Sequence, residues 1–93
     1  MNDQKYLKAE LESTIVYYIR PHFLTIEFEE DFFHIILCHP KFTNLSIEHR
    51  VNSVFALLRH TNSDILEKYT VVVECYAPTE MQWIFDNLGE KIC

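Results

Sequence analysis

Apolar side chains recur at helical spacing in the N-terminal part of the chain. This stripe consists of Leu7, Leu11, Ile15 and Ile19, with Tyr6 and Tyr18 flanking it. Residues four apart lie on the same face of an α-helix, so the spacing predicts an amphipathic helix over residues 3–19. Pro21 cannot continue a helix and is expected to end this one.

Two strand-like segments follow, over residues 23–28 and residues 32–38. The first segment places Leu24, Ile26 and Phe28 on one side. The second is almost continuously apolar. Only the acidic turn Glu29-Glu30-Asp31 separates the two segments, so we expect an antiparallel hairpin with a solvated tip.

A second helix is indicated after Pro40, which closes the second strand. Ser46 is a favourable N-cap for this helix. Its apolar stripe consists of Ile47, Val51, Val54, Phe55 and Leu58. The polar residues 59–63 are expected to interrupt the helix, and a short helix at residues 64–67 should follow. Asp64 suits the positive end of the short helix dipole.

Residues 69–76 have the strongest strand pattern, because four of these eight residues are β-branched. Pro78 and the capping-box pair Thr79 and Gln82 then predict a last helix, which Gly89 is expected to end. The apolar stripe of the last helix consists of Met81, Ile84, Phe85 and Leu88.

The predicted element order is α-β-β-α-α-β-α, and residues 1–93 are expected to form a single α+β domain. The connection from the second strand to the third passes over two helices, and such a crossover makes these strands parallel. We therefore predict a three-stranded mixed sheet with helices on one face. The residues expected to be largely buried are Leu11, Ile15, Ile26, Ile35, Val54, Phe55, Leu58, Val72 and Ile84.

Composition and charge exclude several classes of function. The chain has 14 acidic against 8 basic residues, a net charge of −6 and a single glycine. One glycine cannot form a Gly-rich phosphate loop. The acidic balance disfavours nucleic acid, which is bound largely through Lys and Arg. No apolar run has the ~18 residues of a membrane span. The polar N-terminus does not resemble a signal peptide, so we expect a cytoplasmic protein with reduced thiols.

The histidines and cysteines suggest neither an enzyme nor a metal site. There is no Cys-x-x-Cys motif, and no local pattern combines a nucleophile with a base. Cys38 and His39 are adjacent on a strand and should point to opposite faces, whereas His34 and Cys38 share a face about 13 Å apart. We therefore expect Cys38 and Cys75 to be buried thiols, and the protein not to be an enzyme.

Two sites are candidates for contact with a partner. His49 and Arg50 lie off the apolar stripe of the second helix, where they form either a solvated face or a basic contact spot. Trp83 lies off the stripe of the last helix and either marks a contact surface or folds onto the sheet edge.

Four stretches of the sequence resemble the BolA-like family, whose fold is akin to the second type of KH domain. The stretches are Ile19-Arg20-Pro21 with Leu24-Thr25-Ile26, residues 33–38 with Lys41-Phe42, residues 54–58, and residues 71–81. They occur in the family's order along nearly the whole chain. The resemblance implies a partner of the monothiol glutaredoxin type and a role in handling [2Fe–2S] clusters. Some relatives are described as DNA-binding transcription regulators.

Some positions differ from the family pattern. Tyr69 stands where the family has a histidine that ligates the cluster, and tyrosine is a poor substitute for imidazole there. Of the family's Arg-His-Arg in the central helix, only Arg50 matches. Asn44 replaces a glycine and tolerates positive φ. The loop that supplies another ligand is shortened to residues 29–31.

The sequence thus leaves three hypotheses. The first is a non-enzymatic adaptor that binds a protein partner, such as a monothiol glutaredoxin, and has His49, Arg50, Tyr69 and Trp83 as candidate contact residues. The second is a DNA-binding regulator, which the missing Gly-x-x-Gly loop disfavours. The third is a divergent scaffold that binds an unrelated protein.

We also expect the chain alone to hold neither a [2Fe–2S] cluster nor zinc. Cys38 and Cys75 end neighbouring strands and can lie close together, but apolar surroundings should disfavour their thiolates. Any cluster would be shared with a glutaredoxin partner, with His49 as the first residue to mutate.

Overall fold

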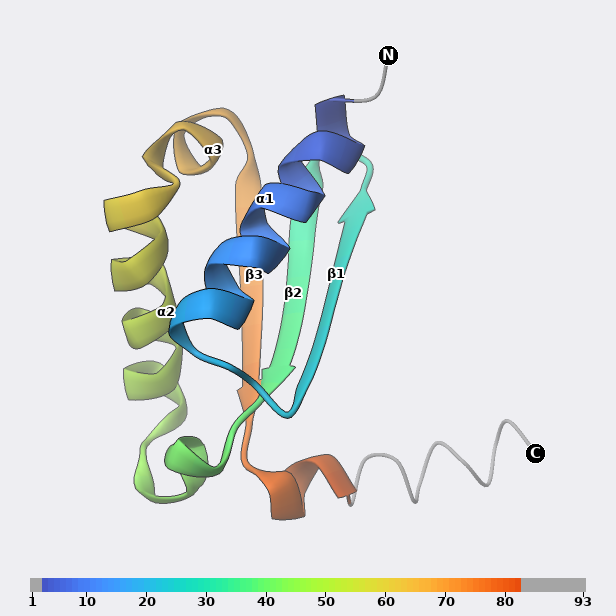
Figure 1. Ribbon diagram of the computed structural model, residues 1–93. Coiled ribbons are helices and arrows are strands. Elements are labelled where there is room, and N and C mark those ends of the chain that lie inside the picture. The colour runs from blue at the N-terminus through green and yellow to red at the C-terminus, as the bar shows by residue number, and fades with distance from the viewer. Residues whose placement is uncertain (1–2, 83–93) are drawn as a thin grey trace, which may run out of the picture.

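Figure 1 shows the computed structural model, which describes residues 3–82. Its elements are α1 (Asp3–Tyr18), β1 (Phe23–Glu29), β2 (Phe32–Cys38), the 3-10 helix η1 (Pro40–Asn44), α2 (Ile47–Thr61), α3 (Ser63–Lys68) and β3 (Thr70–Tyr76). Residues 78–82 begin a further helical segment. The predicted α+β architecture and element order are confirmed for this part of the chain.

The sheet has the order β1-β2-β3 and is mixed, as predicted. β1 pairs with β2 in antiparallel orientation, and β2 pairs with β3 in parallel orientation. Glu29 lies opposite Phe32, so a two-residue turn joins β1 to β2. The first turn residue, Glu30, has a positive φ of 54°. The acidic residues of this turn are exposed, which confirms a solvated hairpin tip.

One face of the sheet carries the core. The largest fully buried side chains are Phe33, Leu11, Ile15, Ile35, Leu37, Leu58 and Val54. They come from β2, α1 and α2, and Figure 1 shows α1 crossing the sheet beside α2. Burial of these side chains removes apolar surface from water, which is the main force that holds helices and sheet together.

Six of the nine predicted core residues are buried, two differ, and one lies outside the described residues. Val72 is 41% exposed, because its neighbours Val71 and Val73 face the helices and alternation turns Val72 outward. Phe55 is only half-buried against the core. Ile84 lies outside the described residues.

The second helix is longer than predicted. α2 continues to Thr61, and only Asn62 separates it from α3. The polar residues expected to break the helix lie at its end, where Arg59 and His60 are exposed to solvent. Asn62 is buried, and its Nδ2 donates to Glu10 Oε1 of α1 at 3.4 Å. The chain therefore turns where a buried amide contacts a neighbouring helix.

The last helical segment begins differently from the prediction. The backbone N–H of Ala77 donates to Glu80 Oε1 at 2.9 Å, so Glu80 caps the segment and the pair Thr79 and Gln82 does not. Met81 is buried, as its stripe predicted. The remaining stripe residues Ile84, Phe85 and Leu88, together with Gly89, lie outside the described residues.

Two smaller findings complete the fold. Asn44 is the last residue of η1, and the positive φ values in the described part of the chain belong to Arg20 and Glu30, so Asn44 does not adopt the positive φ that it tolerates. None of the helices within residues 3–82 combines the length and apolar character needed to cross a membrane.

Candidate functional site

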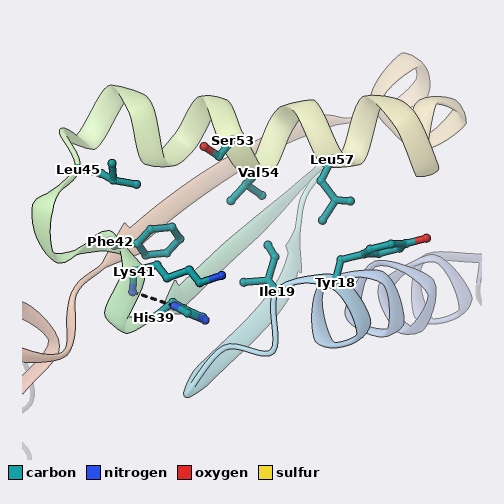
Figure 2. A pocket seen from close by; sticks show the side chains of 9 residues that line it. All are labelled: Tyr18, Ile19, His39, Lys41, Phe42, Leu45, Ser53, Val54 and Leu57. Atoms are coloured by element: carbon teal, nitrogen blue, oxygen red, sulfur yellow. Dashed lines mark hydrogen bonds between the residues drawn. The ribbon is translucent and has the colours of Figure 1, made fainter.

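A groove of about 330 Å³ opens where the end of α1, η1 and α2 meet. The groove is lined by Tyr18, Ile19, His39, Lys41, Phe42, Leu45, Ser53, Val54 and Leu57. Figure 2 shows the α2 side chains facing those of η1 and of the end of α1. Most of these side chains are apolar, and Tyr18 at one end is 60% exposed. The groove is therefore an accessible apolar hollow with polar groups at its rim.

Local hydrogen bonds in η1 hold one wall of the groove. Pro40 supplies a fixed φ at the start of η1, and His39 caps it by accepting from the Lys41 N–H through Nδ1 at 2.9 Å. Thr43 Oγ1 donates to the Pro40 carbonyl oxygen at 2.7 Å. These bonds turn the chain so that Phe42 is buried beneath the groove.

The polar groups near this wall are mostly basic. The backbone N–H of His22 donates to the Cys38 carbonyl oxygen, which brings the His22 and His39 rings to 6.1 Å between centroids. Burial lowers the pKa of His39 from 6.5, and the charges of Lys41 and His22 lower it further. The His39 ring is therefore neutral at pH 7, and Lys41 is the positive charge of the lining. In a chain of net charge −6, this wall has the opposite sign to the molecule as a whole.

His49 lies on the groove side of α2. It is one turn before Ser53 and two turns before Leu57, both of which line the groove. Its backbone N–H donates to the N-cap Ser46 Oγ at 3.1 Å, while its side chain is exposed. His49 therefore stays a candidate contact residue beside the groove.

Arg50 is not the exposed contact residue that its sequence position suggested. Its side chain is 5% exposed, and its guanidinium donates to Glu80 Oε1 and Oε2 at 2.7 and 3.1 Å. It also donates to the carbonyl oxygens of Leu45 and Cys75 at 2.9 and 3.2 Å. Arg50 therefore joins α2 to the end of β3 and to the last helical segment. We call these contacts the Arg50 clamp.

A periodic signal for this burial was present in the sequence. Arg50 lies four and eight residues before Val54 and Leu58, so it continues the most deeply buried line of α2. Its guanidinium carbon also lies 6.0 Å from the centre of the Phe42 ring. The Arg50 clamp thus lies next to Phe42, which lines the groove.

Tyr69 belongs to an aromatic cluster at the other end of the sheet. Its ring centroid lies 5.6 Å from that of Phe28 and 5.4 Å from that of Phe33, with edge-to-face geometry. The side chain is half-buried, so Tyr69 mainly packs against the core. It does not meet His49 or Arg50 in one site, and Trp83 lies outside the described residues.

The described thiols and imidazoles do not fit an iron–sulfur cluster. Cys75 pairs in register with Leu37 and shares the helix-covered face of the sheet, whereas Cys38 points to the opposite face. The two thiols therefore do not converge, contrary to the sequence-based expectation that they could lie close. Burial raises the pKa of Cys75 to about 11 and also raises that of Cys38. Among residues 3–82, no three His, Cys, Asp or Glu side chains are grouped to hold a metal.

No family model and no curated protein matches the sequence. Solved structures match the fold. BolA1 from Arabidopsis thaliana superposes with a TM-score of 0.67 at 17% identity, covering 78% of this chain and 93% of that one. The chain has a BolA-like fold.

Two more structures match this BolA-like fold. The BolA domain of SufE1 from Arabidopsis thaliana has a TM-score of 0.67 and 14% identity, covering 80% of this chain and 94% of that one. A Bol-like protein from Babesia bovis has a TM-score of 0.67 and 15% identity, covering 86% of this chain and 92% of that one. In SufE1, the BolA fold is one domain of the protein.

Proposed function

We propose that this BolA-like protein is a non-enzymatic adaptor that binds a protein partner through the groove between α1, η1 and α2. The partner we propose is a monothiol glutaredoxin, in the handling of iron–sulfur clusters. The groove carries the proposal, because it combines an apolar lining, an exposed tyrosine and one lysine on a supported wall. The sequence resemblance to the BolA-like family supplies the partner class.

The lining of the groove suggests the chemistry of the partner segment. A volume of about 330 Å³ accommodates a few side chains rather than a folded element. Its apolar walls favour aliphatic or aromatic side chains, and the amine of Lys41 favours a neighbouring carboxylate. Tyr18 can bury a large amphipathic ring on binding, as tyrosines at the centre of interfaces often do. An apolar loop with an acidic residue would fit this site.

The proposed adaptor holds no cluster by itself and shares one only with its partner. The position that matches the family's histidine ligand is Tyr69, which is packed against Phe28 and Phe33. His49 is exposed beside the groove and is the imidazole we propose for contact with a partner-held cluster. Replacement of His49 should therefore reduce the visible absorption of a shared cluster more than it reduces the affinity for the apo partner.

Calorimetry with a monothiol glutaredoxin, in apo and cluster-loaded forms, tests the proposal. Tyr18→Ala should weaken binding about tenfold, because a buried interface tyrosine contributes on the order of 1–2 kcal/mol. Tyr6→Ala is the matched control, since Tyr6 is 71% exposed on α1 and does not line the groove. Lys41→Glu should weaken binding more at low salt than at high salt, because salt screens the charge of this residue.

Two results would contradict the proposal. Absence of binding to both the apo and the cluster-loaded form would exclude the glutaredoxin as partner. If the protein instead captures another protein, and Tyr18→Ala abolishes that capture, it is an adaptor for an unrelated partner. Equal losses for Tyr18→Ala and Tyr6→Ala would exclude the groove. DNA binding is the alternative function, and a gel shift at low salt tests it. The net charge of −6 and the internal pairing of Arg50 oppose that function.

A further inference from the structure

The face of the sheet opposite α1 is amphipathic. It carries the side chains of β1–β3 that alternate with the buried ones, and we call it the outer face. Val72 is 41% exposed there, and Phe32, Ile36 and Tyr76 are half-buried. Figure 1 shows α1 across the other side of the sheet, and no helix within residues 3–82 lies over the outer face. Apolar surface is thus left in contact with water.

The charges on the outer face have one sign. Glu27, Glu29 and Glu74 all point to it, and the three strands contain no lysine or arginine. His34 is the one basic side chain of these strands. Glu29 Oε2 lies 4.0 Å from His34 Nδ1, and Glu27 pairs with His34 in register. Three carboxylates against one imidazole leave a negative charge whether or not His34 is protonated.

Glu74 is held in place on this face. His34 Nε2 contacts Glu74 Oε2, and the Tyr76 hydroxyl donates to Glu74 Oε1. The hydrogen bond from Tyr76 lowers the pKa of Glu74, and that of Tyr76 is raised to about 12, so Glu74 stays ionised and Tyr76 stays a donor. A carboxylate accepts about four hydrogen bonds, so further donors can still bind Glu74. A fixed carboxylate loses little entropy when it binds a cation.

We propose that the outer face binds a basic amphipathic peptide segment of a partner protein, independently of the groove. Lysine or arginine side chains of that segment would bind Glu27, Glu29 and Glu74, and its apolar side chains would cover Ile36 and Val72. Charge complementarity selects this occupant. A second copy of the chain is disfavoured, because two outer faces would bring like charges together.

The test measures fluorescence anisotropy of labelled peptides with the full-length protein. Three peptides alternate valine with lysine, glutamine or glutamate. The lysine peptide should bind most tightly, and its affinity should fall as salt is added. Glu27→Gln and Glu74→Gln should each weaken binding about two- to fivefold, as loss of one solvent-accessible ion pair does. Glu12→Gln is the matched control, because Glu12 is exposed on α1.

Amide chemical shifts should change in β1–β3 when the lysine peptide binds, while those of Ser53 and Leu57 at the groove stay unchanged. Equal affinity for the lysine and glutamine peptides would overturn the proposal, as would an equal loss with Glu12→Gln. If sedimentation shows a dimer and Val72 lies in its interface, the outer face binds a second copy of the chain. Nuclear Overhauser contacts from the Trp83 ring to Val72 would assign it to the chain itself. Either assignment would overturn the proposal.

Discussion

Arg50 is the one charged side chain that is almost fully buried within residues 3–82. A buried guanidinium is tolerated only when its donors are paired, and here two carboxylate oxygens and two backbone carbonyls accept them. The paired Glu80 is 45% exposed, so water reaches one side of the ion pair. The clamp therefore fixes α2 relative to the end of β3.

Removal of Glu80 should destabilise the protein through Arg50. Glu80→Ala leaves the buried guanidinium without its counter-ion and removes the cap on Ala77. We expect a loss of about 2–3 kcal/mol in the free energy of unfolding, measured by urea denaturation. Glu67→Ala on the exposed side of α3 is the control and should change stability by less than about 0.5 kcal/mol. If Glu80→Ala also lost less than about 0.5 kcal/mol, the Arg50 clamp would contribute little to the free energy of unfolding.

Acid should weaken the same contact. The hydrogen bond from Arg50 holds the pKa of Glu80 below its ordinary value of 4.5. A carboxyl whose pKa is lower in the folded state stabilises the fold above its unfolded pKa, and that stabilisation is lost as the pH falls through the folded pKa. Wild type should therefore be more stable than Glu80→Gln at pH 7, and the two should converge as the pH falls below 4.5 and through the folded pKa of Glu80. Circular dichroism of urea unfolding at each pH measures the difference. A gap that persists in acid would mean that the charge of Glu80 is not its cause.

α2 combines two roles through two of its faces. Val54 and Leu58 are buried in the core, Ser53 and Leu57 line the groove, and Val54 belongs to its lining as well. Helical periodicity places these pairs next to each other, so the packing of α2 sets the position of one groove wall. The same helix also carries Arg50, and its Ser46 cap orders its first turn.

Leu58→Ala tests the packing of α2. Leu58 is fully buried, and truncation of such a side chain removes apolar contacts and leaves a cavity. We expect a loss of about 2–5 kcal/mol in the free energy of unfolding. Asn52→Ala, on the exposed side of α2, should stay within about 0.5 kcal/mol of wild type. A loss below about 1 kcal/mol for Leu58→Ala would contradict the packing described for α2.

Taken as one molecule, the protein carries chemically different surfaces on opposite sides of one sheet. The helix side has an apolar groove with a basic wall, and the outer face is acidic. The buried thiols lie on different faces and in surroundings that disfavour their thiolate forms. The groove and the outer face are the two surfaces that we propose for binding partners. That residues 1–93 form a single domain stays a prediction.

The protein alone should not retain a [2Fe–2S] cluster or zinc. Cluster iron requires thiolate or imidazole ligands in one place, and burial raises the pKa of Cys75 to about 11. We expect no stable visible chromophore after anaerobic reconstitution with iron and sulfide. A chromophore that disappears in Cys38→Ser or Cys75→Ser would contradict this expectation. A chromophore that forms only with a glutaredoxin, and is lost in His49→Ala, would support the shared site.

The order and type of the elements followed from the sequence. Apolar periodicity and proline positions act locally, so α1, the hairpin, α2 and β3 were predicted with errors at a few boundaries. The mixed sheet followed because the helical crossover makes β3 parallel to β2, whereas the BolA-like fold was implied by the resemblance of four stretches to that family. The burial of Leu11, Ile15, Ile26 and Ile35 was also predicted, whereas Phe33 and Leu37 of β2 are fully buried without having been predicted.

Contacts between distant segments were decided only by the tertiary structure. The roles of Arg50 and Glu80 depend on each other although 30 residues separate them. The spacing of Arg50 from Val54 and Leu58 indicated its buried face, but a local pattern does not reveal the distant carboxylate that pairs with it. Val72 was assigned to the core because four consecutive β-branched residues leave the phase of alternation open. The groove likewise exists only because α1, η1 and α2 meet in space. Local periodicity thus determines the elements, whereas the sites arise from side chains that the packing brings together.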